Sequence, residues 1–269
     1  REVQAEAGSK EWPSARWGFN MVPLGRSAFL VFGGLDNFFP EPHQSYNDVW
    51  LYSTVEGVWK MLREDHSQDF GPPNGLWYEL SAVAHRDGMA VVEQVGGNVW
   101  SFNVSTAEWT LVFSPGPTPE RAPGGTVCVQ GRCDVILTID PFLNVWTFDM
   151  NRLVWTMVAD NTTAPLPLPT NRYQYLLAAE ESDTEGHYDV LLFGGSFSPT
   201  SGDQFNDLWM LSPTSSTGSS WEWSRIPQGP HKPPIREHSC WPLDPVPART
   251  LYGGYGAINL NDTWTLTLH

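Results

Sequence analysis

Five short segments of the sequence repeat one pattern. It consists of two mostly polar residues, one further residue and a tryptophan, after which a large apolar side chain recurs at the second position. The five tryptophans are Trp50, Trp100, Trp146, Trp209 and Trp264. Alternation with period two is typical of half-buried β-strands. A fixed unit repeated along a chain predicts a fold in which each copy buries its apolar face against its neighbours.

A second tryptophan follows the first at a fixed interval in three of the copies. The pairs separated by nine residues are Trp50 and Trp59, Trp100 and Trp109, and Trp146 and Trp155. In the fourth copy a longer turn rich in Ser, Thr and Gly precedes Trp221 and Trp223. Two strands joined by a tight turn would place these rings on neighbouring strands of one sheet, where large aromatic side chains fill the space between sheets.

Another apolar strand precedes each tryptophan strand, and most of these strands end in paired glycines. The strand ends are Phe32-Gly33-Gly34, Val95-Gly96-Gly97, Phe193-Gly194-Gly195 and Tyr252-Gly253-Gly254, whereas the third copy has Ile139-Asp140. Paired glycines permit positive φ angles and close packing at a strand end.

An aromatic-Gly-Gly strand, a tryptophan strand and a second tryptophan after a short turn together resemble the kelch repeat. The resemblance implies an all-β, five-bladed β-propeller of four-stranded blades. One domain would span 1–269, with blades near 16–63, 76–114, 121–159, 172–227 and 236–269 plus 1–6. The inner strands are expected near 17–23, 77–84, 124–129, 173–179 and 237–243, and the next strands near 28–33, 88–94, 134–139, 188–193 and 248–253. An N-terminal strand at 2–6 would close the ring beside 262–267.

Charge and hydropathy exclude some classes of function. The formal net charge is −15 and no run of Lys and Arg occurs, which disfavours nucleic-acid binding because the surface repels phosphate backbones. No apolar stretch approaches the ~18 residues of a membrane-spanning helix, so no transmembrane segment is expected. No basic amino terminus leads into an apolar segment, so a signal peptide is expected to be either absent from this sequence or already removed.

The cysteines and the Asn-x-Ser/Thr sequons bear on the compartment. Cys128 and Cys133 flank a predicted hairpin turn. Two reduced thiols are the alternative, but we predict that these cysteines are disulfide-bonded and that Cys240 is free. Sequons for N-glycosylation begin at Asn103, Asn161 and Asn261. A secreted or lumenal glycoprotein is the interpretation that these features favour, with a cytoplasmic protein as the alternative.

The kelch resemblance implies that partners bind on the face formed by the loops before the inner strands and after the second strands. Arginines at the starts of the expected inner strands are Arg16, Arg121, Arg172 and Arg236, and the second unit has Leu76 instead. They either bind an anionic ligand through bidentate hydrogen bonds or pair with nearby acids and carbonyls to hold the blades together. The flanking aromatic residues expected on this face are Trp17, Phe38, Tyr46, Phe197 and Tyr255. They either contact a ligand or fold back over their own loops.

Catalytic and metal-binding patterns are sparse. No Gly-x-Ser-x-Gly or Cys-x-x-Cys motif occurs, and Asp183 and His187 fall in an expected turn, so we predict no catalytic residue, metal or cofactor. The expected function is a non-catalytic protein-interaction module that binds a protein or peptide, with an acidic segment as one candidate partner. The alternative is a secreted propeller that binds or processes carbohydrate. The expected inner strands carry little acid beyond Glu79 and Glu237, which disfavours acid–base sugar chemistry.

Overall fold

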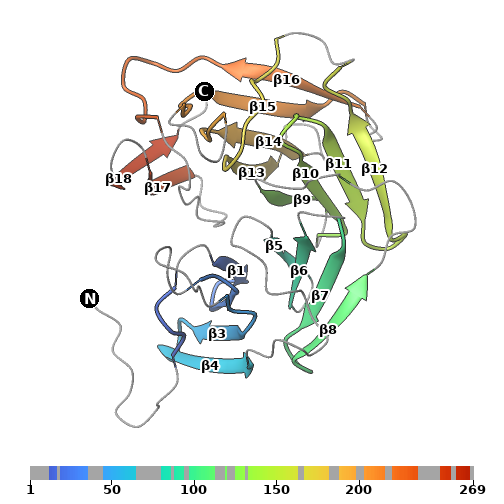
Figure 1. The fold of residues 1–269 in the computed structure, drawn as a ribbon, viewed down its shortest axis with the longest axis vertical. Helices are drawn as coiled ribbons and strands as arrows, with labels where there is room; N and C mark the ends of the chain where they lie inside the picture. Colours follow the sequence, from blue (N-terminus) through green and yellow to red (C-terminus); the bar gives the residue numbers. More distant parts are fainter. Residues whose placement is uncertain are drawn as a thin grey trace. The chain divides into compact units, whose positions relative to one another are not determined.

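The computed structural model describes fifteen stretches of the chain. They are residues 12–16, 19–35, 45–64, 80–85, 88–93, 97–112, 119, 125–130, 133–162, 167–181, 188–197, 203–215, 220–235, 249–255 and 259–266. The chain divides into two compact units, Arg1–Phe113 and Ser114–His269. Figure 1 shows that the described elements are strands throughout.

The first unit contains two four-stranded antiparallel sheets, each with its strands in sequence order. Blade 1 consists of β1 (Asn20–Leu24), β2 (Ala28–Phe32), β3 (Val49–Ser53) and β4 (Val58–Arg63). Blade 2 consists of β5 (Leu80–His85), β6 (Gly88–Glu93), β7 (Val99–Asn103) and β8 (Glu108–Val112). The first strands of the two blades, β1 and β5, lie next to each other.

The second unit also contains two four-stranded antiparallel sheets with their strands in sequence order. Blade 3 consists of β9 (Thr126–Gln130), β10 (Val135–Ile139), β11 (Val145–Asp149) and β12 (Val154–Ala159). Blade 4 consists of β13 (Leu176–Glu181), β14 (Tyr188–Phe193), β15 (Leu208–Pro213) and β16 (Trp221–Ile226). Two further strands, β17 (Arg249–Tyr255) and β18 (Asn259–Leu266), form an antiparallel pair.

The prediction of four-stranded antiparallel blades is confirmed, but the described residues form four such blades and not five. In the fifth repeat only the pair β17–β18 is described. Its expected inner strand at 237–243 and the expected closing strand at 2–6 lie outside the described residues. The number of blades therefore differs from the prediction at the fifth repeat, whose first and last strands were expected in these two segments.

The turn between the third and fourth strands explains the nine-residue spacing of the tryptophans. In blades 1 to 3 the residue two positions before the second tryptophan has a positive φ: Gly57 (73°), Ala107 (56°) and Leu153 (58°). The amide of each of these residues donates to the carbonyl oxygen four residues earlier, at 2.8–2.9 Å. One turn geometry thus sets one spacing, and a left-handed residue is what such a tight reversal requires.

The second tryptophan packs against the third strand of its own sheet, as expected. Trp109 lies opposite Phe102 in the register of β7 and β8, with ring centroids 4.9 Å apart. Its ring also lies 5.1 Å from Phe32 of blade 1, so it fills the space between the two sheets of this unit. Burying an aromatic side chain of this size stabilises the folded state by roughly 1.5–3 kcal/mol.

Candidate functional site

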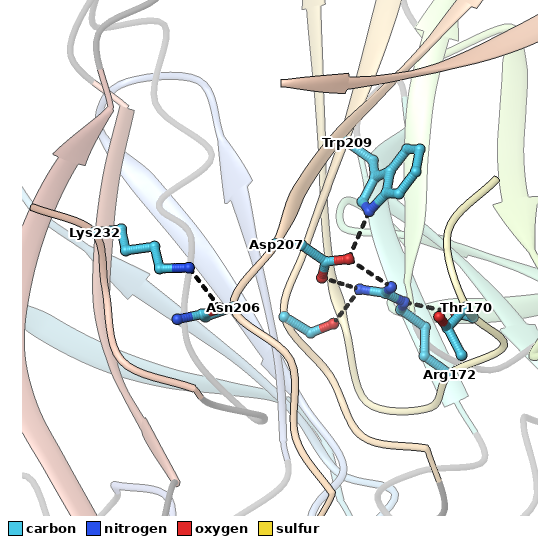
Figure 2. A network of polar contacts seen from close by, with 7 residues as sticks. Thr170, Arg172, Asn206, Asp207, Trp209 and Lys232 are labelled. Carbon is cyan, nitrogen blue, oxygen red and sulfur yellow. Dashed lines mark hydrogen bonds and ion pairs between the residues drawn. The ribbon is translucent and has the colours of Figure 1, made fainter. Parts of the chain in front are cut away.

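A buried arginine organises the loops at one end of blade 4. Arg172 has no exposed surface, and Figure 2 shows its guanidinium group enclosed by polar partners. Its Nε donates to the Thr170 carbonyl (2.9 Å) and its Nη1 donates to the Gly194 carbonyl (3.0 Å). Nη1 and Nη2 also donate to the two carboxylate oxygens of Asp207, at 2.6 and 3.0 Å. This bidentate pairing holds the start of the inner strand against the start of the third strand.

Asp207 joins the arginine to the repeated tryptophan. Trp209 Nε1 donates to Asp207 Oδ2 at 2.7 Å. Burial alone would raise the pKa of Asp207, but the hydrogen bonds and the charge of Arg172 outweigh it and lower the pKa below its ordinary value. The carboxylate is therefore ionised at neutral pH, and we call these three side chains the Arg-Asp-Trp network.

Blade 1 contains the same network. Arg16 makes a bidentate pair with Asp48, whose Oδ2 also accepts a hydrogen bond from Trp50 Nε1 at 2.7 Å. Arg16 Nη1 donates to the carbonyl of Gly33 at 3.0 Å, and Gly33 corresponds to Gly194 of blade 4. Two blades in different units thus use the same residue types in the same order.

Paired glycines make room for this network. Gly33 and Gly34 have φ angles of 72° and 98°, and Gly194 and Gly195 have φ angles of 67° and 91°. Only glycine adopts such values without strain. A Cβ atom on Gly195 would lie 2.6 Å from the carbonyl oxygen of Tyr173, so the close approach of two backbone segments also requires glycine here.

Blade 3 lacks the glycines and supplies a carboxylate from their position. Asp140 Oδ1 accepts hydrogen bonds from the amides of Phe142 and Asn144, both at 2.9 Å, and Oδ2 accepts one from Asn144 Nδ2 at 2.8 Å. Burial raises the pKa of Asp140 above its ordinary value, against the effect of these hydrogen bonds. Asn144 occupies the position of Asp48 and Asp207 in the repeat. In blade 3 the acid, Asp140, therefore lies at the start of this loop and not at its end.

The predicted arginines therefore have internal partners where they are described. Most of the guanidinium nitrogens of Arg16 and Arg172 donate hydrogen bonds to carbonyls and carboxylates of their own blades. This geometry favours the second of the two roles considered for them, which is holding the blade together. Their role in ligand binding stays a prediction. Arg121 and Arg236 lie outside the described residues.

The three predicted aromatic residues that the structure describes lie in three different kinds of position. Tyr46 lies under a guanidinium group, with its ring centroid 4.1 Å from Arg16 Cζ, as does Phe205 at 4.3 Å from Arg172 Cζ. Tyr255 is the last residue of β17 and pairs with Asn259, so it belongs to a strand. Phe197 is 54% exposed. Trp17 and Phe38 lie outside the described residues.

A second exposed aromatic residue, which the sequence analysis did not single out, lies in the short loop of blade 3. Phe142 is 48% exposed and follows Pro141, whose carbonyl accepts a hydrogen bond from the Arg172 amide at 3.1 Å. The next residue, Tyr173, forms a two-way backbone bridge with Ser196, directly before Phe197.

These hydrogen bonds link the loops of blades 3 and 4 to each other. The Phe197 amide also donates to the carbonyl of Asp203, an exposed residue, at 2.9 Å. We call Phe142, Tyr173, Phe197 and Asp203 the loop face. It combines two exposed phenylalanine side chains and the exposed Asp203 on backbone that these hydrogen bonds fix.

The disulfide is confirmed. Cys128 of β9 and Cys133, directly before β10, are bonded, with their Cα atoms 4.9 Å apart. Cys133 has a φ of 65°, which lets the chain reverse between the two cysteines. A disulfide of this kind persists in an oxidising compartment.

We expect thiol titration in denaturant to find one reactive thiol per chain without reductant and three after reduction, since the chain has three cysteines. Replacing both bonded cysteines with serine should cost about 2 kcal/mol, because the bond closes a short loop. Three reactive thiols before reduction would contradict the pairing.

Strand β13 extends further than expected and carries Glu180 and Glu181 at its end. The other described inner strands, β1, β5 and β9, carry no acid. Within the part of the chain that the structure describes, no group of three or more His, Cys, Asp and Glu side chains is placed to hold a metal ion. The search for membrane spans, over the same residues, found no helix long and apolar enough to cross a bilayer.

Comparison with known proteins adds the class of fold. No protein-family model matches the chain, and no curated protein sequence matches it. Among 121 matching chains of solved structures is the structure of YjhT, which is 15% identical. The match has a TM-score of 0.61 and covers 98% of this chain and 86% of that one. Together with the sheet order, this likeness shows that the chain is an all-β propeller with four-stranded antiparallel blades.

Proposed function

We propose that this protein is a non-catalytic interaction module and that a protein or peptide binds on the loop face. The observation that carries the proposal is the exposure of Phe142 and Phe197 on two loops that backbone hydrogen bonds hold together. Exposed aromatic rings on a rigid support lose little conformational freedom on binding and supply apolar contact area.

The negative charge of the chain indicates what kind of partner would bind. The chain carries a net charge of −15, and the exposed Asp203 lies beside Phe197. An acidic partner would need free guanidinium groups, whereas Arg172 is fully buried in an ion pair with Asp207. We therefore infer that the partner is a segment that combines apolar side chains with Lys or Arg, because opposite charge favours the encounter.

The family, the blade number and the compartment belong to the same proposal. We infer a kelch-type propeller of five blades, in which the pair β17–β18 is part of the fifth blade and residues 2–6 supply its last strand. The three aromatic-Gly-Gly strand ends and the five tryptophan strands support this inference. The disulfide supports a secreted or lumenal protein.

Carbohydrate binding is the competing function. The described inner strands support sugar processing poorly, because acids occur in only one of them, at the end of β13. Sugar binding without chemistry is a distinct outcome that the same experiment detects.

The proposal is tested by selecting a library of random 12-residue peptides on the immobilised protein in physiological salt, in parallel with a glycan array. We expect selected peptides enriched in Lys or Arg next to aromatic or aliphatic residues, with affinities that fall as salt is raised. Selection of acidic peptides would overturn the inferred charge of the partner. Binding to glycans alone, with no peptide enriched, would overturn the protein-interaction function.

A further inference from the structure

The turn between β7 and β8 carries a sequon in a conformation that leaves its asparagine nitrogen free. Asn103 ends β7 and is exposed, as is Ser105. Asn103 Oδ1 accepts hydrogen bonds from the Ser105 amide (2.9 Å), the Ser105 hydroxyl (2.6 Å) and the Thr106 amide (3.2 Å). The oxygen thus caps the turn, and among the described residues no hydrogen bond engages Nδ2.

The cap is a structural position that blade 2 shares with blades 1 and 3, and it does not need an asparagine. In blade 3 Asp149 Oδ1 accepts from the amides of Asn151 and Arg152, both at 2.9 Å. In blade 1 Ser53 Oγ accepts from the amide of Glu56 at 3.1 Å. Only an acceptor oxygen is required, so the side-chain nitrogen of Asn103 has no structural duty.

The other two sequons are placed differently. Asn161 is half-buried, its amide donates to Asn144 Oδ1 at 3.1 Å, and its Nδ2 donates to Asn171 Oδ1 at 3.5 Å. Asn261 lies within β18. A bulky group on the Asn161 nitrogen would meet the loop that leads to Arg172, whereas a group on Asn103 would extend from an exposed turn at the edge of blade 2.

We propose that Asn103 is an N-glycosylation site and that it is the sequon whose modification the fold accommodates best. In the reaction, Nδ2 of Asn103 bonds to C1 of an oligosaccharide, and the bond from C1 to the diphosphate oxygen of a lipid-linked donor breaks. The lipid diphosphate leaves and Nδ2 loses one proton. The disulfide between Cys128 and Cys133 is an independent observation that fits this route, because the same oxidising compartment supplies the glycosyl donor.

The test uses the full chain behind a heterologous signal peptide, translated in the presence of microsomes. We expect a slower band that a peptide-N-glycosidase converts to the unmodified mobility, and deamidation of Asn103 after that treatment by mass spectrometry. Asn103→Asp is the informative variant, because it keeps the oxygen that caps the turn, as Asp149 does in blade 3, and removes the acceptor nitrogen. The modification at this site should be lost in Asn103→Asp and retained in Ser105→Thr.

The microsome readout does not depend on whether a variant folds or is secreted. Unmodified Asn103 in the translocated wild-type chain would overturn the proposal, and so would a mobility shift that Asn103→Asp leaves unchanged. As a second measurement, unfolding of Asn103→Asp in urea should match the wild type, because the cap is preserved.

Discussion

Replacing Asp207 with alanine is expected to destabilise the protein by about 3–5 kcal/mol, the usual cost of leaving a buried charge without its partner. Arg172 would keep its positive charge at a site with no exposed surface and would lose two of its hydrogen bonds. Trp209 Nε1 would lose its acceptor as well. Urea unfolding monitored by tryptophan fluorescence measures this difference.

The matched control is Arg152→Ala, which removes an exposed ion pair. Arg152 lies 3.7 Å from Asp149 and its side chain is 82% exposed, so its loss should change the stability by less than about 1 kcal/mol. The pKa of Asp207 is lowered in the folded chain, so its stabilising effect is complete above the ordinary pKa and is lost as the pH falls through the folded value. If Asp207→Ala were as mild as the control, Arg172 would not depend on this pair and would again be available to a ligand.

Gly195→Ala should have an effect of similar size for a different reason. The φ of 91° is strained for alanine, which costs roughly 1–3 kcal/mol. The new Cβ would also lie 2.6 Å from the Tyr173 carbonyl oxygen, so the backbone bridge between Tyr173 and Ser196 would have to separate. We expect a total cost of at least about 3 kcal/mol and weaker peptide binding, because this bridge supports the loop face.

Two other glycines separate these causes. Gly25→Ala has a φ of 63° but open space around the new Cβ, so it should show only the conformational cost of about 1–2 kcal/mol. Gly229→Ala has open space and no positive φ, so it should stay within about 0.5 kcal/mol of the wild type. Equal stability of all three variants would show that the close approach at Gly195 does not constrain the loop.

Much of the blade architecture could be predicted because the sequence contains its own repeats. The tryptophan spacing predicted the hairpin of the third and fourth strands, and the observed left-handed turn residue explains why that spacing is constant in three blades. The disulfide followed from two cysteines on either side of a hairpin turn. A fifth blade was predicted from Trp264 and the glycines before it, and the structure describes the two-stranded sheet β17–β18 in that repeat.

The partners of the arginines were the part of the site that sequence reasoning left undecided. A signal was present, because the first, fourth and fifth units combine the arginine, the glycine pair and an Asp two residues before the tryptophan. The second unit has Leu76 and Asn98 at the arginine and aspartate positions. The third unit departs from this correlation, because it has Arg121 but Asn144. In the other four units the correlation predicts an ion pair within a blade.

The loop face could not have been predicted in the same way. Phe142 was not singled out, because it stands in a unit that departs from the repeat and its exposure depends on the turn that Asp140 holds. Tyr46 was predicted either to contact a ligand or to fold back over its own loop, and its ring lies against the Arg16 guanidinium group of the same blade. The positions of aromatic residues on loops do not separate these two environments, because both kinds lie within a few residues of the repeated positions.

The most direct test of the proposed interaction surface is calorimetric titration of a selected cationic peptide into the wild type and into a Phe142→Ser, Phe197→Ser double variant. Leu153→Ser with Met157→Ser is the matched control, since these exposed apolar residues lie in the β11–β12 turn and on β12 and are not part of the loop face. We expect the affinity to fall at least about tenfold in the first variant, because two buried aromatic contacts contribute more than about 1.4 kcal/mol, and to stay unchanged in the control. Equal affinity of the wild type and the Phe142→Ser, Phe197→Ser variant would contradict the assignment of binding to this surface.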